Sequence, residues 1–171
     1  QKAVGGIGNY LDRTRPAGDV MLGPIDTYSL DDHLVIEETS FRNLEIVQTL
    51  IGGRRQGSLL GLLDRTCTAM GARQLRRWLQ RPLRSIRTIQ EVQVAVLELQ
   101  DITLVGEMVR SLLSHVYDIG RLGGRVRAGA ADPRDLANLR RSLEDLGTLR
   151  SEMAGLSGSR LKQLAENLDP L

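Results

Sequence analysis

The chain has 171 residues, of which 41% are hydrophobic and 26% are charged. These values are ordinary for a soluble globular domain, and they disfavour disordered, collagen-like and membrane classes. No apolar run approaches the roughly 18 residues that a membrane helix requires. The single cysteine, Cys67, excludes an internal disulfide and indicates a reducing, cytoplasmic location. Because the first residue is Gln1 and no signal-peptide pattern follows it, we expect a piece of a longer protein.

Charge is distributed unevenly along the chain, although the net charge is only +2. Residues 54–87 contain nine arginines and one acid, Asp64, so this segment carries +8 and the remainder carries −6. Two interpretations stay open: the arginines contact nucleic-acid phosphates, or they pair with acids of the same chain such as Glu144, Asp145 and Glu152. We favour pairing, because five aromatic side chains and no groove-reading motif give little basis for reading DNA.

Three arginines of this segment, Arg73, Arg76 and Arg77, fall on one side of a predicted helix over 66–80. Projecting the segment at 100° per residue places Trp78 within an apolar stripe, so we expect its indole to be buried. Pro82 ends the helix, because it lacks a backbone donor and restricts the residue before it. The candidate residues for contact with DNA or a partner lie opposite the stripe or just after the helix: Arg73, Arg76, Arg77 and Arg81.

The amino-terminal part of the chain predicts a mixture of short elements. Apolar residues at helical spacing favour a helix over 4–11, and two short strands are expected around 25–30 and 33–37. Asn43 is predicted to cap a helix that carries the apolar residues of 46–50, with a pair of glycines ending it.

The rest of the chain reads as helical, with start signals of different strength. Thr88 and Glu91 form a predicted capping box, and Asp101 is expected to open the next helix. A glycine-weakened helix is expected over 119–126. A last short helix is expected to begin at Ser159.

The longest helix has the clearest start signal. Asp132 is a capping residue, Pro133 suits the first helical position, and Asp135 places a carboxylate in the first turn. Leucines and a methionine then recur in steps of three and four over 136–156. A stripe this narrow predicts a rod that packs along another rod.

We find no motif that predicts catalysis or cofactor binding. The segment 52–59 has two glycines five residues apart, as a phosphate-binding loop does. However, Ser58 stands in place of the required lysine, and Leu59 stands in place of a magnesium-binding hydroxyl. His33 and His115 are not at metal-ligand spacing. We therefore expect no catalytic, cofactor-binding or metal-binding residue in this chain, and ATP turnover by it is disfavoured.

Four segments, at 41–45, 58–73, 75–83 and 118–136, resemble in order the core domain of the MutS family of DNA mismatch-repair proteins. The residues that carry this resemblance are Arg42, Asn43, Leu44, Glu45, Asp64, Thr66, Thr68, Gly71, Arg73, Trp78, Pro82, Arg121, Pro133, Arg134, Asp135 and Leu136. The resemblance covers essentially the whole chain.

The resemblance implies a fold that is mainly α: an elongated multi-helix domain with long antiparallel lever helices and a minor β element near the amino terminus. Residues 1–24 would form an amino-terminal helix and connection, and residues 25–171 the helical core or lever domain. The domain would act as a structural and allosteric relay between a DNA clamp and an ATPase. The parent protein would be a homodimer that binds mismatched double-stranded DNA, uses ATP and magnesium, and recruits a MutL-type protein.

Two alternatives remain from the sequence. One is an autonomous helical module that binds nucleic acid through the surface from Arg54 to Arg87. The other is a MutS-like paralogue that acts on recombination intermediates or ribosomes.

Overall fold

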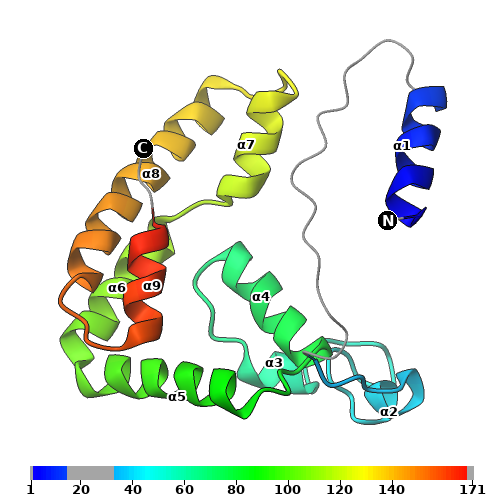
Figure 1. Cartoon of the computed structure of the whole chain (residues 1–171), viewed down its shortest axis with the longest axis horizontal. Helices are drawn as coiled ribbons and strands as arrows, with labels where there is room; N and C mark the ends of the chain where they lie inside the picture. Colours follow the sequence, from blue (N-terminus) through cyan, green and yellow to red (C-terminus); the bar gives the residue numbers. More distant parts are fainter. Residues whose placement is uncertain (1, 15–32, 169–171) are drawn as a thin grey trace.

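The computed structural model describes residues 2–14 and 33–168, and this part of the chain is built from helices (Figure 1). They are α1 (Lys2–Thr14), α2 (Glu38–Asn43), α3 (Leu59–Leu63), α4 (Ala69–Gln80), α5 (Ile86–Asp101), α6 (Thr103–His115), α7 (Ile119–Arg127), α8 (Pro133–Met153) and α9 (Ser159–Asn167). The prediction of a mainly α fold is confirmed. None of these helices is long and apolar enough to cross a membrane.

The predicted β element is not confirmed. The strand expected around 25–30 lies outside the described residues, and the strand expected over 33–37 is wrong. His33 forms only an isolated antiparallel bridge with Leu83, and the Leu34 amide donates to the Pro82 carbonyl at 2.8 Å. The pairing stops there because the chain turns into α2 within a few residues.

The helix expected after Asn43 is also wrong, because Asn43 is the last residue of α2. Glu45 has φ of 49°, a left-handed conformation that breaks a helix. Its side chain accepts a hydrogen bond from the Leu50 amide at 2.6 Å, which stabilises a turn instead. Ile46 is nevertheless buried, and its carbonyl accepts from the Leu60 amide at 2.8 Å.

The starts of α5 and α6 differ from the predicted ones. Ser85 caps α5, its hydroxyl accepting from the Thr88 amide, so the helix begins before the expected capping box. Glu91 pairs instead with Arg87, one turn earlier on the same helix. Asp101 ends α5 rather than opening α6, which has no side-chain cap. Side chains suited to capping occur at several positions here, and the local pattern alone did not select the right one.

The predicted start of α8 is confirmed. The Asp135 amide donates to the Asp132 carboxylate at 2.7 Å, and the Asp132 amide donates to the Asp135 carboxylate at 3.1 Å. This reciprocal capping box precedes a helix of 21 residues. The helix is shorter than the predicted rod because it ends at Met153, and Leu156 is buried in the turn that follows.

The core lies where α5, α6, α8 and α9 meet. Its buried residues are Ala95, Leu149, Met153, Leu156, Leu161 and Ala165. In Figure 1, α8 runs beside α6, and after α8 the chain turns back so that α9 packs against α8 and α5. Only the second half of the α8 stripe enters this core: Leu136 is 50% exposed, and Leu139 lines an open groove on the helix flank.

Trp78 is 41% exposed, so the predicted burial of its indole is wrong. The helical projection gave the apolar face of α4, but it did not show what covers that face. Among the described helices, α4 packs closely against α3 and not along any helix from α5 to α9. The apolar stripe of α4 therefore remains partly open to solvent.

Candidate functional site

The arginine-rich helix α4 is the centre of the charged surface that the sequence singled out. Thr68 caps it, the hydroxyl accepting from the Gly71 amide at 2.9 Å. The helix ends one residue before Arg81, where Pro82 prevents its continuation. The candidate contact residues Arg73, Arg76, Arg77 and Arg81 are all exposed.

Arg73 pairs with an acid that the charge analysis did not name. Its guanidinium donates two hydrogen bonds to the Asp118 carboxylate, at 2.6 and 3.0 Å, although the residues are 45 positions apart. The expected pairing with α8 is wrong, since Glu144 pairs with Arg140 of its own helix at 2.9 Å. A carboxylate oxygen of Asp145 is buried and accepts no hydrogen bond from the described residues.

Asp118 serves two elements at once. Besides pairing with Arg73, it caps α7, its carboxylate accepting from the Arg121 amide at 3.3 Å. The hydrogen bonds from Arg73 are the largest cause that lowers the pKa of Asp118 below its ordinary value. The same bonds raise the pKa of Arg73. Both groups therefore remain charged near neutral pH, and the bidentate pair connects α4 to the start of α7.

The other candidate arginines have different surroundings. Arg76 lines a hollow of about 290 Å³ together with Arg55 and Gln48, and among the described residues it makes no ion pair. The backbone carbonyl of Arg81 lies 3.1 Å from a ring nitrogen of His33. Arg73 lines the same hollow as Arg76, whereas Arg81 lies at the turn after α4.

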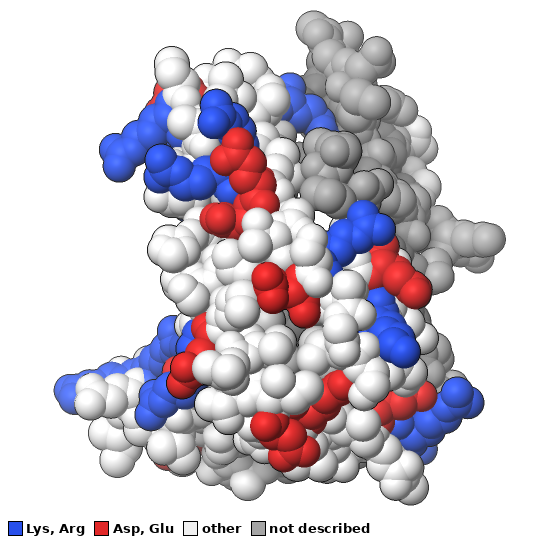
Figure 2. All heavy atoms as spheres, turned by 90° about the vertical axis from the view of Figure 1, so that its left-hand side faces the viewer, with Lys and Arg blue, Asp and Glu red and all other residues white. Residues whose placement is uncertain are grey.

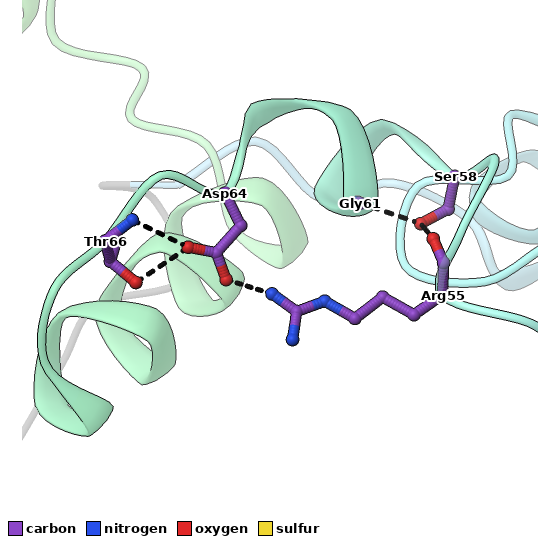
Figure 3. A network of polar contacts seen from close by, with 5 residues as sticks. All are labelled: Arg55, Ser58, Gly61, Asp64 and Thr66. Carbon is purple, nitrogen blue, oxygen red and sulfur yellow. Dashed lines mark hydrogen bonds and ion pairs between the residues drawn. The ribbon is translucent and has the colours of Figure 1, made fainter.

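A second polar network fixes the segment before α4 (Figure 3). The Asp64 carboxylate accepts from the Thr66 amide at 3.0 Å and the Thr66 hydroxyl at 2.7 Å, and it pairs with Arg55. These bonds, those from Thr66 first, lower the pKa of Asp64. The Ser58 hydroxyl donates to the Arg55 carbonyl and accepts from the Gly61 amide.

This network shows what the segment resembling a phosphate loop does here. Ser58 is 1% exposed and caps the short helix α3. A side chain at Gly61 would overlap the Arg55 carbonyl, so the close approach of two backbone segments requires glycine there. Within 52–59, the residues Gly52, Gly53 and Gly57 all have positive φ, so the glycine pattern of this segment serves a compact turn. Within the described residues, no cluster of three or more His, Cys, Asp or Glu side chains has the arrangement of a metal site.

The motif residues near α8 form one further connection. Asp135 pairs with Arg125 of α7 at 3.0 Å, and Arg125 also donates to the Ala130 carbonyl at 3.1 Å. Pro133 and Asp135 are thus parts of the junction between α7 and α8. The neighbouring motif residues Arg134 and Leu136 are exposed.

Two residues that no sequence pattern singled out join parts of the chain that are far apart in the sequence. Glu98 of α5 accepts hydrogen bonds from the Ser157 amide, the Ser157 hydroxyl and the Gly158 amide, at 2.5 to 2.8 Å. Arg110 of α6 donates to the Arg65 carbonyl at 2.9 Å and contacts the Cys67 sulfur at 3.2 Å. Neither residue belongs to a local motif, so no signal in the sequence distinguished them from ordinary surface charges.

A groove of about 740 Å³ separates α4 from the elbow between α5 and α6. Its walls include Leu75 of α4, Leu99 of α5 and Val109 of α6, and Arg110 lies along it. The face drawn in Figure 2, the left-hand side of Figure 1, carries basic and acidic side chains interspersed rather than a field of one sign. The charged side chains described so far mostly join one helix or turn to another.

These features define the class of the protein: in the described residues it is a helical domain in which long-range arginine contacts tie a bundle of packed helices to a smaller arginine-rich part. Residues 39–170 match the family model of MutS domain III. The chain belongs to the MutS family.

Similar proteins agree with this assignment. The chain is 44% identical over 165 residues to the DNA mismatch repair protein MutS of Microcystis aeruginosa, covering 96% of the chain and 19% of that protein. It is 42% identical over 165 residues to MutS of Thermosynechococcus vestitus, with the same coverage. It is 40% identical over 160 residues to MutS of an Exiguobacterium species, covering 94% of the chain and 19% of that protein. The chain thus spans about a fifth of the length of these relatives.

Proposed function

We propose that this domain is the helical core of a DNA mismatch-recognition protein and acts as a mechanical relay between its DNA-binding and ATP-hydrolysing parts. The observation that supports the proposal is the packing of α8, a helix of 21 residues, against α6, α7 and α9. A well-packed bundle moves as a body rather than deforming, because side chains in a dense core cannot slide gradually past one another. A displacement at one end of α8 would then reach the other end.

The remaining functions belong to the parent protein in this proposal. The parent is a cytoplasmic homodimer that binds mismatched double-stranded DNA, hydrolyses ATP with magnesium, and recruits a MutL-type protein. The domain itself contributes no catalytic residue. The structural roles of Ser58 and Asp64 support this division, since both side chains are used in holding the turn before α4.

Softening α8 without changing its buried face tests the relay. Arg141 and Thr148 are both exposed on this helix. Replacing both with glycine lowers the stability of the helix by about 1 kcal/mol per position relative to alanine. The variant with alanine at both positions is the matched control. In the full-length protein, we expect the change in ATP turnover caused by mismatched DNA to shrink in the glycine variant only. Equal responses in the two variants would contradict the relay.

The competing function is direct nucleic-acid binding by the arginine surface. It is favoured by Arg76, which makes no ion pair with another described residue. An electrophoretic assay of the 171-residue chain with duplex DNA at low and moderate salt separates the two. Tight binding that falls steeply with salt, and that is lost in Arg76→Ala, would favour the binding module. The relay predicts weak binding that the substitution leaves unchanged.

A further inference from the structure

The described part of the chain after residue 32 divides into two bodies with separate interiors. We call residues 33–84 the amino-terminal module and residues 86–168 the helical bundle. The hydrophobic cluster of the core contains residues of the bundle alone. In the amino-terminal module, Ile46 and Leu60 are buried instead. Between the described residues, no backbone hydrogen bond joins the two bodies.

Among the described residues, the side-chain hydrogen bonds between the two bodies come from two arginines. Arg73 of the module reaches Asp118 of the bundle, and Arg110 of the bundle reaches the backbone and sulfur atoms just before α4. The groove of about 740 Å³ lies between the same elements. Since α4 is not packed along any bundle helix, these side chains replace the close packing that would otherwise fix the angle between the bodies.

From this arrangement we infer that the Arg73–Asp118 pair is a latch that sets the orientation of the amino-terminal module on the bundle, with the chain at 84–85 as the hinge. A bidentate guanidinium–carboxylate pair suits this role, because its two parallel bonds fix direction as well as distance. Asp118 is also the cap of α7, and α7 is joined to α8 through Arg125 and Asp135. The latch therefore connects the position of α4 to the α7–α8 pair.

The inference deepens the relay proposed above and rests on it for its biological role, since it names the point where motion of one body is passed to the other. Its physical content is separate: breaking the pair frees the two bodies to change their angle, whether or not that motion is used. Arg110 would still hold the bodies near one another, so a change in angle is expected rather than dissociation.

The sequence provides spectroscopic handles for measuring this angle. Trp78 on α4 is the only tryptophan, and Cys67 is the only cysteine. With Cys67 replaced by serine and the exposed Gln163 of α9 replaced by cysteine, an acceptor dye on the bundle reports its distance from the indole of the module. Time-resolved energy transfer then gives both the mean distance and the width of its distribution.

Two single substitutions break the latch from opposite sides. Arg73→Met removes the guanidinium and leaves Asp118 free to cap α7, and Asp118→Ser removes the charge while keeping a good capping side chain. We expect each substitution to shift the mean distance between indole and dye and to broaden its distribution, relative to the labelled chain that keeps both Arg73 and Asp118. The double variant should be no broader than either single one, because both remove the same interaction.

The matched control is Arg140→Met, which breaks an exposed arginine–glutamate pair within α8. Its distance distribution should equal that of the labelled chain that keeps both Arg73 and Asp118. Three results would refute the latch. Both single variants could keep the distance distribution of the labelled chain with Arg73 and Asp118 intact, or the Arg140→Met control could broaden that distribution equally. The broadening caused by the two latch substitutions could also add in the double variant. Circular dichroism of each variant confirms that its helix content is preserved.

A second measurement separates the latch from the relay. In the full-length protein, Arg73→Met should weaken the coupling between DNA binding and ATP turnover, and Arg140→Met should not. If Arg73→Met broadens the distance distribution but leaves the coupling unchanged, the latch stands and the relay fails. If the distribution is unchanged, the latch fails whatever the coupling does.

Discussion

The carboxylate of Glu98 occupies the space that a side chain at position 158 would need. A Cβ atom on Gly158 would overlap one carboxylate oxygen of Glu98, which is itself bonded to the Gly158 amide at 2.8 Å. Gly158 is the capping residue of α9 and has no side chain to offer. A glutamate from α5, 60 positions away in the sequence, therefore supplies the cap and fastens α9 to the bundle.

Replacing Gly158 with alanine should destabilise the protein. The backbone φ of −61° suits alanine, so the cost comes from displacing a carboxylate that three hydrogen bonds hold in place. We expect a loss of about 1–3 kcal/mol in the free energy of unfolding by urea. Gly124→Ala is the control: nothing lies near that Cβ position inside α7, so alanine should stabilise by about 0.5–1 kcal/mol. Loss of stability in both variants would contradict the overlap.

The Glu98 cap should make stability depend on pH. Hydrogen bonds from Ser157, the largest cause, lower the pKa of Glu98. A carboxyl whose pKa is lower in the folded state stabilises the fold above its unfolded pKa, and this contribution disappears as the pH falls through the folded value. Urea unfolding should therefore show a loss that begins below about pH 4.3, the ordinary value for glutamate. In Glu98→Gln, this part of the pH dependence should vanish, and an unchanged profile would exclude the cap as its source.

Ser142 should matter more than an exposed serine of the same helix. It is fully buried, accepts from the Tyr117 amide at 2.9 Å and donates to the Asn138 carbonyl at 2.8 Å. Ser142→Ala leaves the Tyr117 amide without this partner, which costs about 1–3 kcal/mol. Ser151→Ala removes an exposed hydroxyl whose hydrogen bond stays within α8. Its free energy of unfolding, measured by thermal unfolding, should stay within about 0.5 kcal/mol of that of the unsubstituted chain. Equal effects would show that the Tyr117 amide finds another partner.

Truncating a core residue should cost more than truncating the larger Trp78. Leu156 is 2% exposed and belongs to the core cluster, so Leu156→Ala should cost about 2–5 kcal/mol. Trp78 is 41% exposed, so Trp78→Ala should cost less despite the greater volume removed. Chemical denaturation of both variants gives the order, and the reverse order would mean that the indole is covered in solution.

Much of the helical content could be predicted because its signals are local. The reciprocal cap of Asp132 and Asp135 involves residues three positions apart, and the chain shows it without any fold. The Asn43 and Thr88 predictions failed for a related reason. Several side chains in those segments suit a cap, and the left-handed turn at Glu45 or the earlier start at Ser85 was chosen by contacts that the local pattern does not contain.

The arginine surface shows the limit more clearly. Charge counting predicted that arginines pair within the chain, and Arg73 does so, but the acids named for it on α8 were wrong. An arginine reaches any carboxylate that the fold brings near, and the sequence does not state which helices will be neighbours. Asp118 is the first residue of the 118–136 segment that resembles the family, yet nothing nearby in the sequence indicated Arg73 as its partner.

By itself, the sequence determined the helical class, the start of α8, the exposed arginine face of α4 and the MutS family, because spacing, capping and motif order are properties of neighbouring residues. Only the tertiary structure decided that Glu98 caps α9, that Arg73 meets Asp118 across a groove, and that Trp78 remains partly open. These outcomes depend on how complete helices dock against one another. Docking sums many weak contacts between residues far apart in the chain, and no local pattern records that sum.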